Sequence, residues 1–371
     1  MTILDALDVP IVQAPMAGGA GTPRLAAAVS EAGGLGFLAA GYLTPEGLRD
    51  QIRELRGLTG RPFGVNVFVP DTADPDPDAL AGYRDRLAAE ARRYGVPVGD
   101  AGDPGGSAGA ADGGGWLDDY WAGKLAVLHD ERVPLASFTF GCPAPGVVAG
   151  LRAAGIAVVV TVTSPAEATM AASAGADALC VQGPEAGAHR GTFDNELRVD
   201  DLGLLPLLRR VQAATGLPLI AAGGLADGRD VAAVLVAGAR AAQLGTAFLA
   251  CPESGASPLH KAALTDPAYP RTAVTRAFSG RPARGLANRF LLEHGAAAPA
   301  AYPHVHRLTR QLRSAAAAAG DPHGMSLWAG QGHPFAREVP AGELVRALAE
   351  QARSALDEVS ARWHPARRPI R

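Results

Sequence analysis

Lysine and cysteine are scarce in this sequence, and each scarcity excludes a class of site. The chain has 371 residues and 34 lysines and arginines, but only Lys124 and Lys261 are lysines, and neither follows a predicted strand. A Schiff base on a strand-end lysine is therefore excluded. Cys142, Cys180 and Cys251 lie far apart without any C-x-x-C pair, so the sequence supports neither a disulfide framework nor a zinc knuckle. We expect a protein of the reducing cytoplasm.

Long apolar runs and a strong charge of either sign are also lacking. No stretch of 18 apolar residues occurs, and the first residues do not combine basic and apolar character as a secretion signal does. The net charge is −3 and no basic stripe is present, which argues against nucleic acid and membranes as partners. Apolar residues make up 48% of the chain, enough for a large core. We expect a small-molecule partner and a monomer or homodimer.

What the sequence has in abundance is a pattern of short apolar runs, each followed by a helix-like segment. Eight runs fall at 11–14, 35–39, 63–68, 135–140, 157–162, 178–182, 218–222 and 241–245. Each is nearly continuous in apolar character and bounded by Gly or Pro, which is typical of parallel strands covered on both faces. Eight repeats favour a (β/α)8 barrel of the TIM type over an open doubly wound sheet.

The segments between the runs carry the start signals of helices. Thr22, Thr44 and Ser164 each precede a proline, and Asp227 precedes a further apolar helix pattern. We expect their side-chain oxygens to cap the first helical turn.

Two segments depart from the repeat. Residues 70–115 contain a helix-like stretch to about Tyr94 and then a Gly-rich loop, which we expect to be a flexible excursion after the third strand. Residues 251–335 show short helices and loops without strand alternation, and an amphipathic helix runs from 341 to about 361. We therefore expect residues 1–250 and 336–371 to form the barrel. Residues 251–335 would be a mainly helical cap inserted between the eighth strand and the C-terminal helix.

Active sites of such barrels lie at the C-terminal ends of the strands, and two of these ends are rich in glycine. Gly223-Gly224 follows the seventh strand, and Gly245-Thr246 follows the eighth. Barrels commonly bind a phosphate here through backbone N–H groups, and glycines allow the backbone to approach it. A tight turn without a ligand would explain Gly223-Gly224 alone equally well.

Amide side chains are expected to converge at the same end of the barrel. They offer donors and acceptors to a polar planar ring without adding charge, which fits the edge of a flavin. Met16, after Ala14 and Pro15, either closes the bottom of this site or contacts the ring through its thioether. The four amides are Gln13, Asn66, Gln182 and Gln243.

His189 is the only histidine at a predicted strand end, in a loop of small residues. An imidazole there has the type and location of a general base that takes a proton from an acidic carbon. A histidine bonded to loop backbone is the alternative. His304 and His306, with His294 nearby, resemble a metal cluster but lack a carboxylate in the same loop, so a solvated cap surface explains them better and no metal site is expected.

Several of these stretches resemble the nitronate monooxygenase family, formerly called 2-nitropropane dioxygenases, in its larger bacterial and fungal class. The resemblance covers residues 11 to about 332. It differs at Ala188, where relatives often have glycine, and at residues 99–115, which have no counterpart. The matching motifs are QAPMAGG at 13–19, FGVNVF at 63–68, SFTFGCP at 137–143, QGPEAGAHRG at 182–191, AAGGLADGR at 221–229, QLGTAF at 243–248, FSGRPARGLANRF at 278–290 and SLWAGQG at 326–332.

The resemblance implies a barrel that binds FMN noncovalently and oxidatively denitrifies alkyl nitronates, such as propionate 3-nitronate, with O2. The products would be a carbonyl compound and nitrite. His189 matches the family's catalytic base, which would remove the α-proton if a neutral nitroalkane is the substrate. The matching positions place on the cofactor Met16, Asn66, Gln182, Gly187, Gly224, Gln243, Gly245 and Thr246. The strand ends add Gln13, Ala14, Pro15, Gly223 and Leu244 to the predicted cofactor site.

Two other functions stay open. A flavin-dependent enoyl-acyl-carrier reductase would need NAD(P)H and a basic face for an acidic carrier protein, which the net charge of −3 does not favour. A non-catalytic flavin-binding partner protein would retain FMN without turnover, and it would leave His189 without a use.

Overall fold

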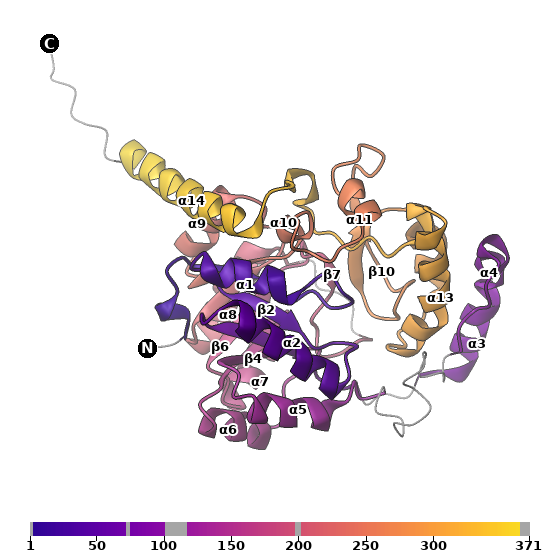
Figure 1. Ribbon diagram of the computed structural model, residues 1–371, viewed down its shortest axis with the longest axis horizontal. Helices are drawn as coiled ribbons and strands as arrows, with labels where there is room; N and C mark the ends of the chain where they lie inside the picture. Colours follow the sequence, from indigo (N-terminus) through magenta and orange to yellow (C-terminus); the bar gives the residue numbers. More distant parts are fainter. Residues whose placement is uncertain (1–2, 72–74, 101–116, 197–201, 364–371) are drawn as a thin grey trace, which may run out of the picture.

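The computed structural model describes residues 3–71, 75–100, 117–196 and 202–363. Within them, eight parallel strands form a barrel (Figure 1). A parallel bridge between Val12 and Leu35 joins the two ends of the sheet and closes it. The predicted (β/α)8 barrel is confirmed. In hydrogen-bonding order the strands are β1 (Ile11–Gln13), β9 (Ala241–Leu244), β8 (Leu219–Ala222), β6 (Ala178–Gln182), β5 (Ala157–Val162), β4 (Leu135–Thr139), β3 (Phe63–Phe68) and β2 (Gly36–Ala39).

Helices follow the strands and cover the outside of the barrel. The last of them, α14, packs between α9 and α1 and so takes the place of the eighth barrel helix, as the sequence predicts. The outer helices are α1 (Pro23–Glu31), α2 (Pro45–Leu58), α5 (Trp121–Asp130), α6 (Pro145–Ala153), α7 (Pro165–Ser173), α8 (Leu204–Thr215), α9 (Gly228–Val236) and α14 (Ala341–Trp363).

The predicted helix caps are present. Thr22, Thr44 and Ser164 each accept a hydrogen bond from the backbone N–H three residues later. Asp227 accepts from the N–H groups of Arg229 and Asp230, and it forms a capping box with Asp230. These oxygens satisfy N–H groups that a helix start leaves without partners.

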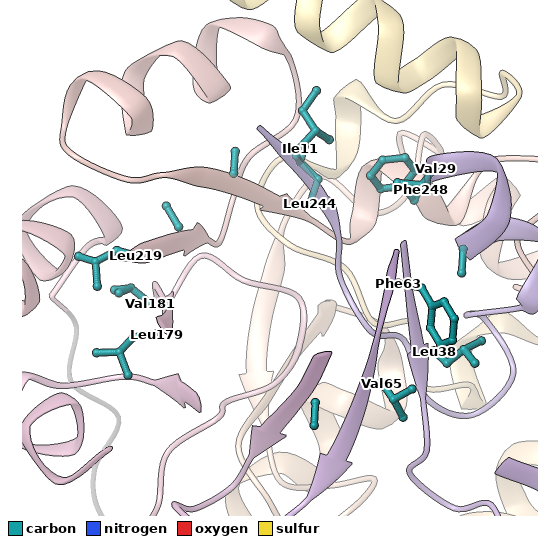
Figure 2. Packing of buried hydrophobic residues seen from close by; sticks show 14 of the residues in the cluster. Ile11, Val29, Leu38, Phe63, Val65, Leu179, Val181, Leu219, Leu244 and Phe248 are labelled. Atoms are coloured by element: carbon teal, nitrogen blue, oxygen red, sulfur yellow. The ribbon is translucent and has the colours of Figure 1, made fainter. Parts of the chain in front are cut away.

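Side chains alternate between the two faces of each strand and so form two apolar layers, one outside the barrel wall and one inside it. Side chains such as Ile11, Leu38 and Val65 point outward and pack beneath the helices (Figure 2). Their neighbours, such as Val12 and Phe37, point inward and fill the barrel together with Leu4 of η1 (Ile3–Ala6). Because successive strand residues face opposite sides, the inward positions nearest the strand ends face the mouth of the barrel.

The cap, residues 251–335, lies over the C-terminal ends of the strands. It is mainly helical, as expected, but it also contains two strands that the sequence does not indicate. These strands pair with each other, and β11 pairs with β7 (Ala188–His189), the two-residue strand that follows β6. The elements between β9 and α14 are α10 (Thr246–Leu249), α11 (Pro258–Ala263), β10 (Thr272–Thr275), β11 (Ala283–Leu286), α12 (Arg289–His294), η2 (Gly295–Ala297), α13 (His304–Ala318), η3 (Pro322–Gly324) and η4 (His333–Phe335).

The excursion after β3 begins with α3 (Pro77–Arg86) and α4 (Ala88–Tyr94), which lie beside α13 of the cap (Figure 1). Tyr83 and Leu87 are buried in one cluster with Phe278 and Phe290, so this part of the excursion is packed. Of the predicted Gly-rich loop at 99–115, residues 101–115 lie outside the described residues. Among the described residues, no helix is long and apolar enough to span a membrane.

Candidate functional site

A cavity of about 620 Å³ opens between the strand ends of the barrel and the cap. It is lined by the ends of β1, β3, β6, β8 and β9 and by α13 of the cap. The predicted site residues that line it are Ala14, Pro15, Met16, Asn66, Gln182, Gly187, His189, Gly223, Gly224, Gln243, Leu244, Gly245 and Thr246.

The glycine turns after β8 and β9 form one end of the cavity. Gly223 and Gly224 have φ values of 130° and 71°, which favour glycine, and a Cβ on Gly224 would lie 2.9 Å from the Glu185 Cβ. Within the described part of the chain, the backbone N–H groups of Gly224, Gly245 and Thr246 donate no hydrogen bond. Three free donors, two of them on glycines, are suited to a phosphate group.

Three of the four predicted amides line the cavity. Asn66 donates from Nδ2 to the hydroxyls of Ser137 (2.9 Å) and Thr139 (3.0 Å), and Gln243 donates from Nε2 to the Cys180 sulfur (3.4 Å). These contacts fix polar side chains on the floor of the cavity, where a flat polar ring could be bound.

Gln13, the fourth predicted amide, does not line the cavity. Its side chain is fully buried; Oε1 accepts from the Phe37 N–H (2.9 Å), and Nε2 donates to the Ala14 carbonyl. Gln13 shares the outward face of β1 with Ile11, because the two are separated by one residue. Its role is to join β1 to β2, and the prediction that it contacts the cofactor is not supported.

Gln182 fixes the loop that carries His189. Its Nε2 donates to the His189 carbonyl (3.0 Å) and its Oε1 accepts from the Gly191 N–H (2.8 Å). On the other side, His189 is paired in register with Ala283 of β11. Barrel and cap therefore both hold the His189 backbone, which sets the direction of the ring.

The imidazole of His189 lies in an aromatic and basic environment. Its Nε2 is 2.8 Å from the Ser279 Oγ, and the rings of Phe140, Tyr302 and Trp328 lie 5.5 to 5.8 Å from it. The same hydroxyl is 3.3 Å from the Arg281 carbonyl, which can accept its proton. In the tautomer in which Ser279 donates to this carbonyl, His189 carries its proton on Nε2 and Nδ1 is the basic nitrogen.

Burial and two arginines keep this imidazole neutral. Desolvation first, and then the charges of Arg281 and Arg313, lower the pKa of His189 to about 3. A neutral imidazole has a free lone pair at neutral pH and can accept a proton.

Helix α13 contributes cavity residues that sequence reasoning missed. His306, Arg310 and Arg313 line the cavity, and the His306 ring stacks on Tyr42 at 4.5 Å. The expectation of a solvated surface was therefore wrong for His306. The one signal in the sequence is that these three basic side chains recur at helical spacing, which places them on one face of α13.

His294, the third histidine of that expectation, lies elsewhere. It is buried against Phe290, and its Nε2 is 3.2 Å from the Glu90 Oε1. Glu90, Glu293 and His294 are close enough to hold a metal ion, but Arg289 already donates to both carboxylates. This cluster ties α4 to α12.

Comparison with known proteins agrees with this geometry. A family model described as "Nitronate monooxygenase" matches residues 2–351. A nitronate monooxygenase of Pseudomonas aeruginosa is 43% identical over 93% of this chain and 96% of its own length. Another, from Paraburkholderia phytofirmans, is 41% identical over 95% of this chain and 94% of its own length.

Two solved structures are similar to this chain over almost its whole length. Nitroalkane oxidase from Streptomyces ansochromogenes is 55% identical, with a TM-score of 0.89 over 96% of this chain and 99% of its own. FabK from Thermotoga maritima is 29% identical, with a TM-score of 0.72 over 97% and 98% of the two chains. The coverage of the family model, the identity of the relatives and the arrangement of the cavity all agree: the chain belongs to the nitronate monooxygenase family.

Proposed function

We propose that this protein is an FMN-dependent enzyme that oxidatively denitrifies alkyl nitronates, such as propionate 3-nitronate, with O2. The products are a carbonyl compound and nitrite. The observation that carries the proposal is the cavity itself, because it combines free backbone donors, fixed amides and a neutral histidine under one cap. In this proposal, residues 1–250 and 336–371 hold the cofactor, and residues 251–335 cover the substrate.

The residues present fit FMN. The N–H groups of Gly224, Gly245 and Thr246 would bind its phosphate, since they have no acceptor within the described residues. Asn66 and Gln243 would lie at the ring system, which needs donors and acceptors along one edge. FMN is favoured over FAD because the sequence has no strand–GxGxxG–helix unit for an adenine dinucleotide. When bound, the flavin supplies the oxidation of the nitronate and the reaction with O2.

His189 has a defined task in this site. With a neutral nitroalkane it accepts the α-proton at Nδ1, and with a nitronate its neutral ring packs beside the anion without repelling it. Ser279 holds the Nε2 side of the ring, and Phe140, Tyr302 and Trp328 surround the ring with aromatic groups, which limits access of water to it.

Three measurements on the purified protein test the proposal. Flavin released by denaturation should be FMN, and propionate 3-nitronate should yield nitrite with consumption of O2. NADH oxidation with an enoyl thioester should be absent. Enoyl thioester reduction without nitrite would indicate a reductase, and retained FMN without turnover of either substrate would indicate a non-catalytic flavin-binding protein.

A further inference from the structure

The charges that line the cavity are of one sign. Within the described residues, Arg310 and Arg313 are its only charged side chains, and no aspartate or glutamate lines it. Both belong to α13 and are three residues apart, so they lie on the same face of the helix. In a chain with a net charge of −3, this local excess of positive charge indicates an anionic ligand.

Neither arginine has a carboxylate partner among the described residues. Arg313 donates from Nε to the Thr309 Oγ1 (3.2 Å) and from Nη2 to the carbonyl (3.1 Å) and the Nδ1 (3.3 Å) of His306. All of these acceptors are neutral. Burial lowers the pKa of Arg313 to about 10, which leaves it cationic at neutral pH. A half-buried cation without a counterion is costly unless a ligand supplies the charge.

The same contacts orient further donors into this region. Because the His306 Nδ1 accepts from Arg313, its Nε2 carries the proton. The His306 ring stacks on Tyr42 at 4.5 Å with an interplanar angle of 10°, and the Tyr42 hydroxyl is 3.3 Å from that of Tyr302. The Tyr302 ring in turn lies 5.8 Å from His189. One chain of ring contacts therefore connects the arginines to the proposed catalytic residue.

We propose that Arg310 and Arg313 form an anion subsite that binds a carboxylate of the substrate, remote from the carbon that bears the nitrogen. This inference rests on the proposed function and adds a substrate preference to it. The two arginines of α13 make the protein prefer nitronates that carry a second negative group. Guanidinium groups suit a carboxylate because they donate two parallel hydrogen bonds to its oxygens. The subsite is separate from the glycine turns of β8 and β9, where the FMN phosphate is proposed.

The test compares two three-carbon substrates that differ in the carboxylate, propionate 3-nitronate and propyl-1-nitronate. Arg310→Met and Arg313→Met keep an unbranched apolar stem and remove the guanidinium charge. Each should lower kcat/KM for propionate 3-nitronate about ten- to hundredfold, as expected for a hydrogen bond to a charged group. The loss should lie in KM, because the carboxylate does not react. The loss with propyl-1-nitronate should be much smaller, and Arg313→Lys should restore part of the loss with propionate 3-nitronate. Arg353→Met, at an exposed position of α14, is the control and should change the kinetics with neither substrate.

Other results would overturn the subsite. Equal losses of kcat/KM with both substrates would mean that the arginines support the shape of the cavity and do not bind the substrate carboxylate. A weaker FMN affinity with unchanged substrate preference would assign them to the cofactor phosphate. If neither the substrate preference nor the FMN affinity changes, the arginines bind neither the substrate nor the cofactor.

Binding without turnover separates this inference from the proposed function. Equilibrium dialysis should show that 3-nitropropionate binds the holoprotein more tightly than 1-nitropropane, and that Arg313→Met removes the difference. If the wild type gives no nitrite but shows this preference, the proposed function fails and the subsite stands. If nitrite forms without any such preference, the subsite fails alone.

Discussion

At the scale of single residues, the site depends on how side chains are held. Histidine is a common residue type for a general base, and the surroundings of His189 give it its properties. Gln182 fixes the His189 backbone, Ser279 contacts Nε2, and burial keeps the ring neutral. Arg281 is fully buried with its guanidinium 4.1 Å from the Phe140 ring centre, and this charge helps to lower the pKa of His189. The result is a base whose protonation does not depend on pH in the physiological range.

Replacing His189 by Asn should therefore affect two substrates differently. A neutral nitroalkane needs a base, whereas a nitronate has already lost its proton, so kcat/KM should fall about 10²–10⁴-fold with the nitroalkane and much less with the nitronate. Initial rates of nitrite release with each substrate measure the two losses. If the wild type uses only nitronates, the comparison is made on nitronate binding. Small losses on both substrates would make His189 a loop histidine without a catalytic role, and equal large losses would make it a binding residue.

The pH profile of the wild type provides an independent check on this prediction. An ordinary histidine protonates near pH 6.5, but the pKa of His189 is lowered to about 3. The base therefore stays free as the pH falls from 8 to 5, and kcat/KM for a nitroalkane should show no loss from His189 in that range. A decline centred near 6.5 that disappears in His189→Asn would contradict the lowered pKa.

All of the predicted site residues except Gln13 line the cavity, and Gln13 shows what limited the prediction. Gln13, Gln182 and Gln243 each lie at or next to the last residue of a strand, so the sequence pattern places them in one group. Side chains alternate between the two faces of a strand, however, and this alternation places Gln13 on a different face from the other two. Gln182 and Gln243 are an even number of residues from the inward Cys180 and Ala241, whereas Gln13 follows the inward Val12 by one. Applied strand by strand, this parity assigns Gln13 to the outward face of β1 and so excludes it from the cavity.

At the scale of elements, the apolar runs predicted the barrel strands to within one residue at either end. Runs 63–68, 157–162 and 178–182 match β3, β5 and β6 completely. These strands are covered on both faces, so their sequences are apolar except at Asn66, Thr161 and Gln182, which line the cavity. The strands β7, β10 and β11 carry no such signal, because they are short and partly exposed and because β11 pairs with β7, which is distant in the sequence.

The sequence also did not reveal which contacts hold the loop after β2 in place. Lys124, fully buried at the start of α5, pairs with Asp119 at 2.7 Å, and the Asp119 Oδ1 accepts from the Tyr42 N–H at 3.0 Å. Tyr42 has a φ of 70°, unusual for a residue with a side chain, and its ring packs on His306 of the cap. The ion pair thus holds a contact between barrel and cap.

Removing one partner of this pair should destabilise the protein strongly. Lys124→Met leaves Asp119 with an uncompensated charge, and the expected loss is about 3–5 kcal/mol of unfolding free energy. Urea unfolding monitored by circular dichroism measures it. The double variant Lys124→Met/Asp119→Asn should recover most of the loss, because Asn keeps an acceptor for the Tyr42 N–H and no buried charge is left alone. An exposed pair, Arg229 and Glu358, is the control, and its removal should have little effect. A single variant as stable as the double would show that the buried charges are not coupled.

At the scale of the whole molecule, the cavity exists only because the cap docks on the barrel. Phe278 and Phe290 of the cap share a cluster with Tyr83 of α3, and β11 extends the loop of His189. Long-range packing of this kind has no local pattern, so the sequence alone does not assign the basic face of α13 to the cavity. It indicates the cap only as an insertion between the eighth strand and the last helix.

Because the proposed cofactor site is built from β1, β3, β8 and β9 together, FMN should stabilise the whole fold. At a free concentration about a hundred times its Kd, a ligand that binds only the folded state adds about 2.7 kcal/mol. Scanning calorimetry should show a higher Tm with FMN and a smaller rise with riboflavin, which lacks the phosphate.

Gly224→Ala and Gly224→Asp share the strain of a side chain at a φ of 71°, so both should lower the Tm of the apoprotein. Only Gly224→Asp adds a negative charge beside the free N–H groups, so it should lose more of the FMN-dependent rise. Equal stabilisation by FMN and riboflavin would mean that the glycine turns shape the barrel end without binding phosphate.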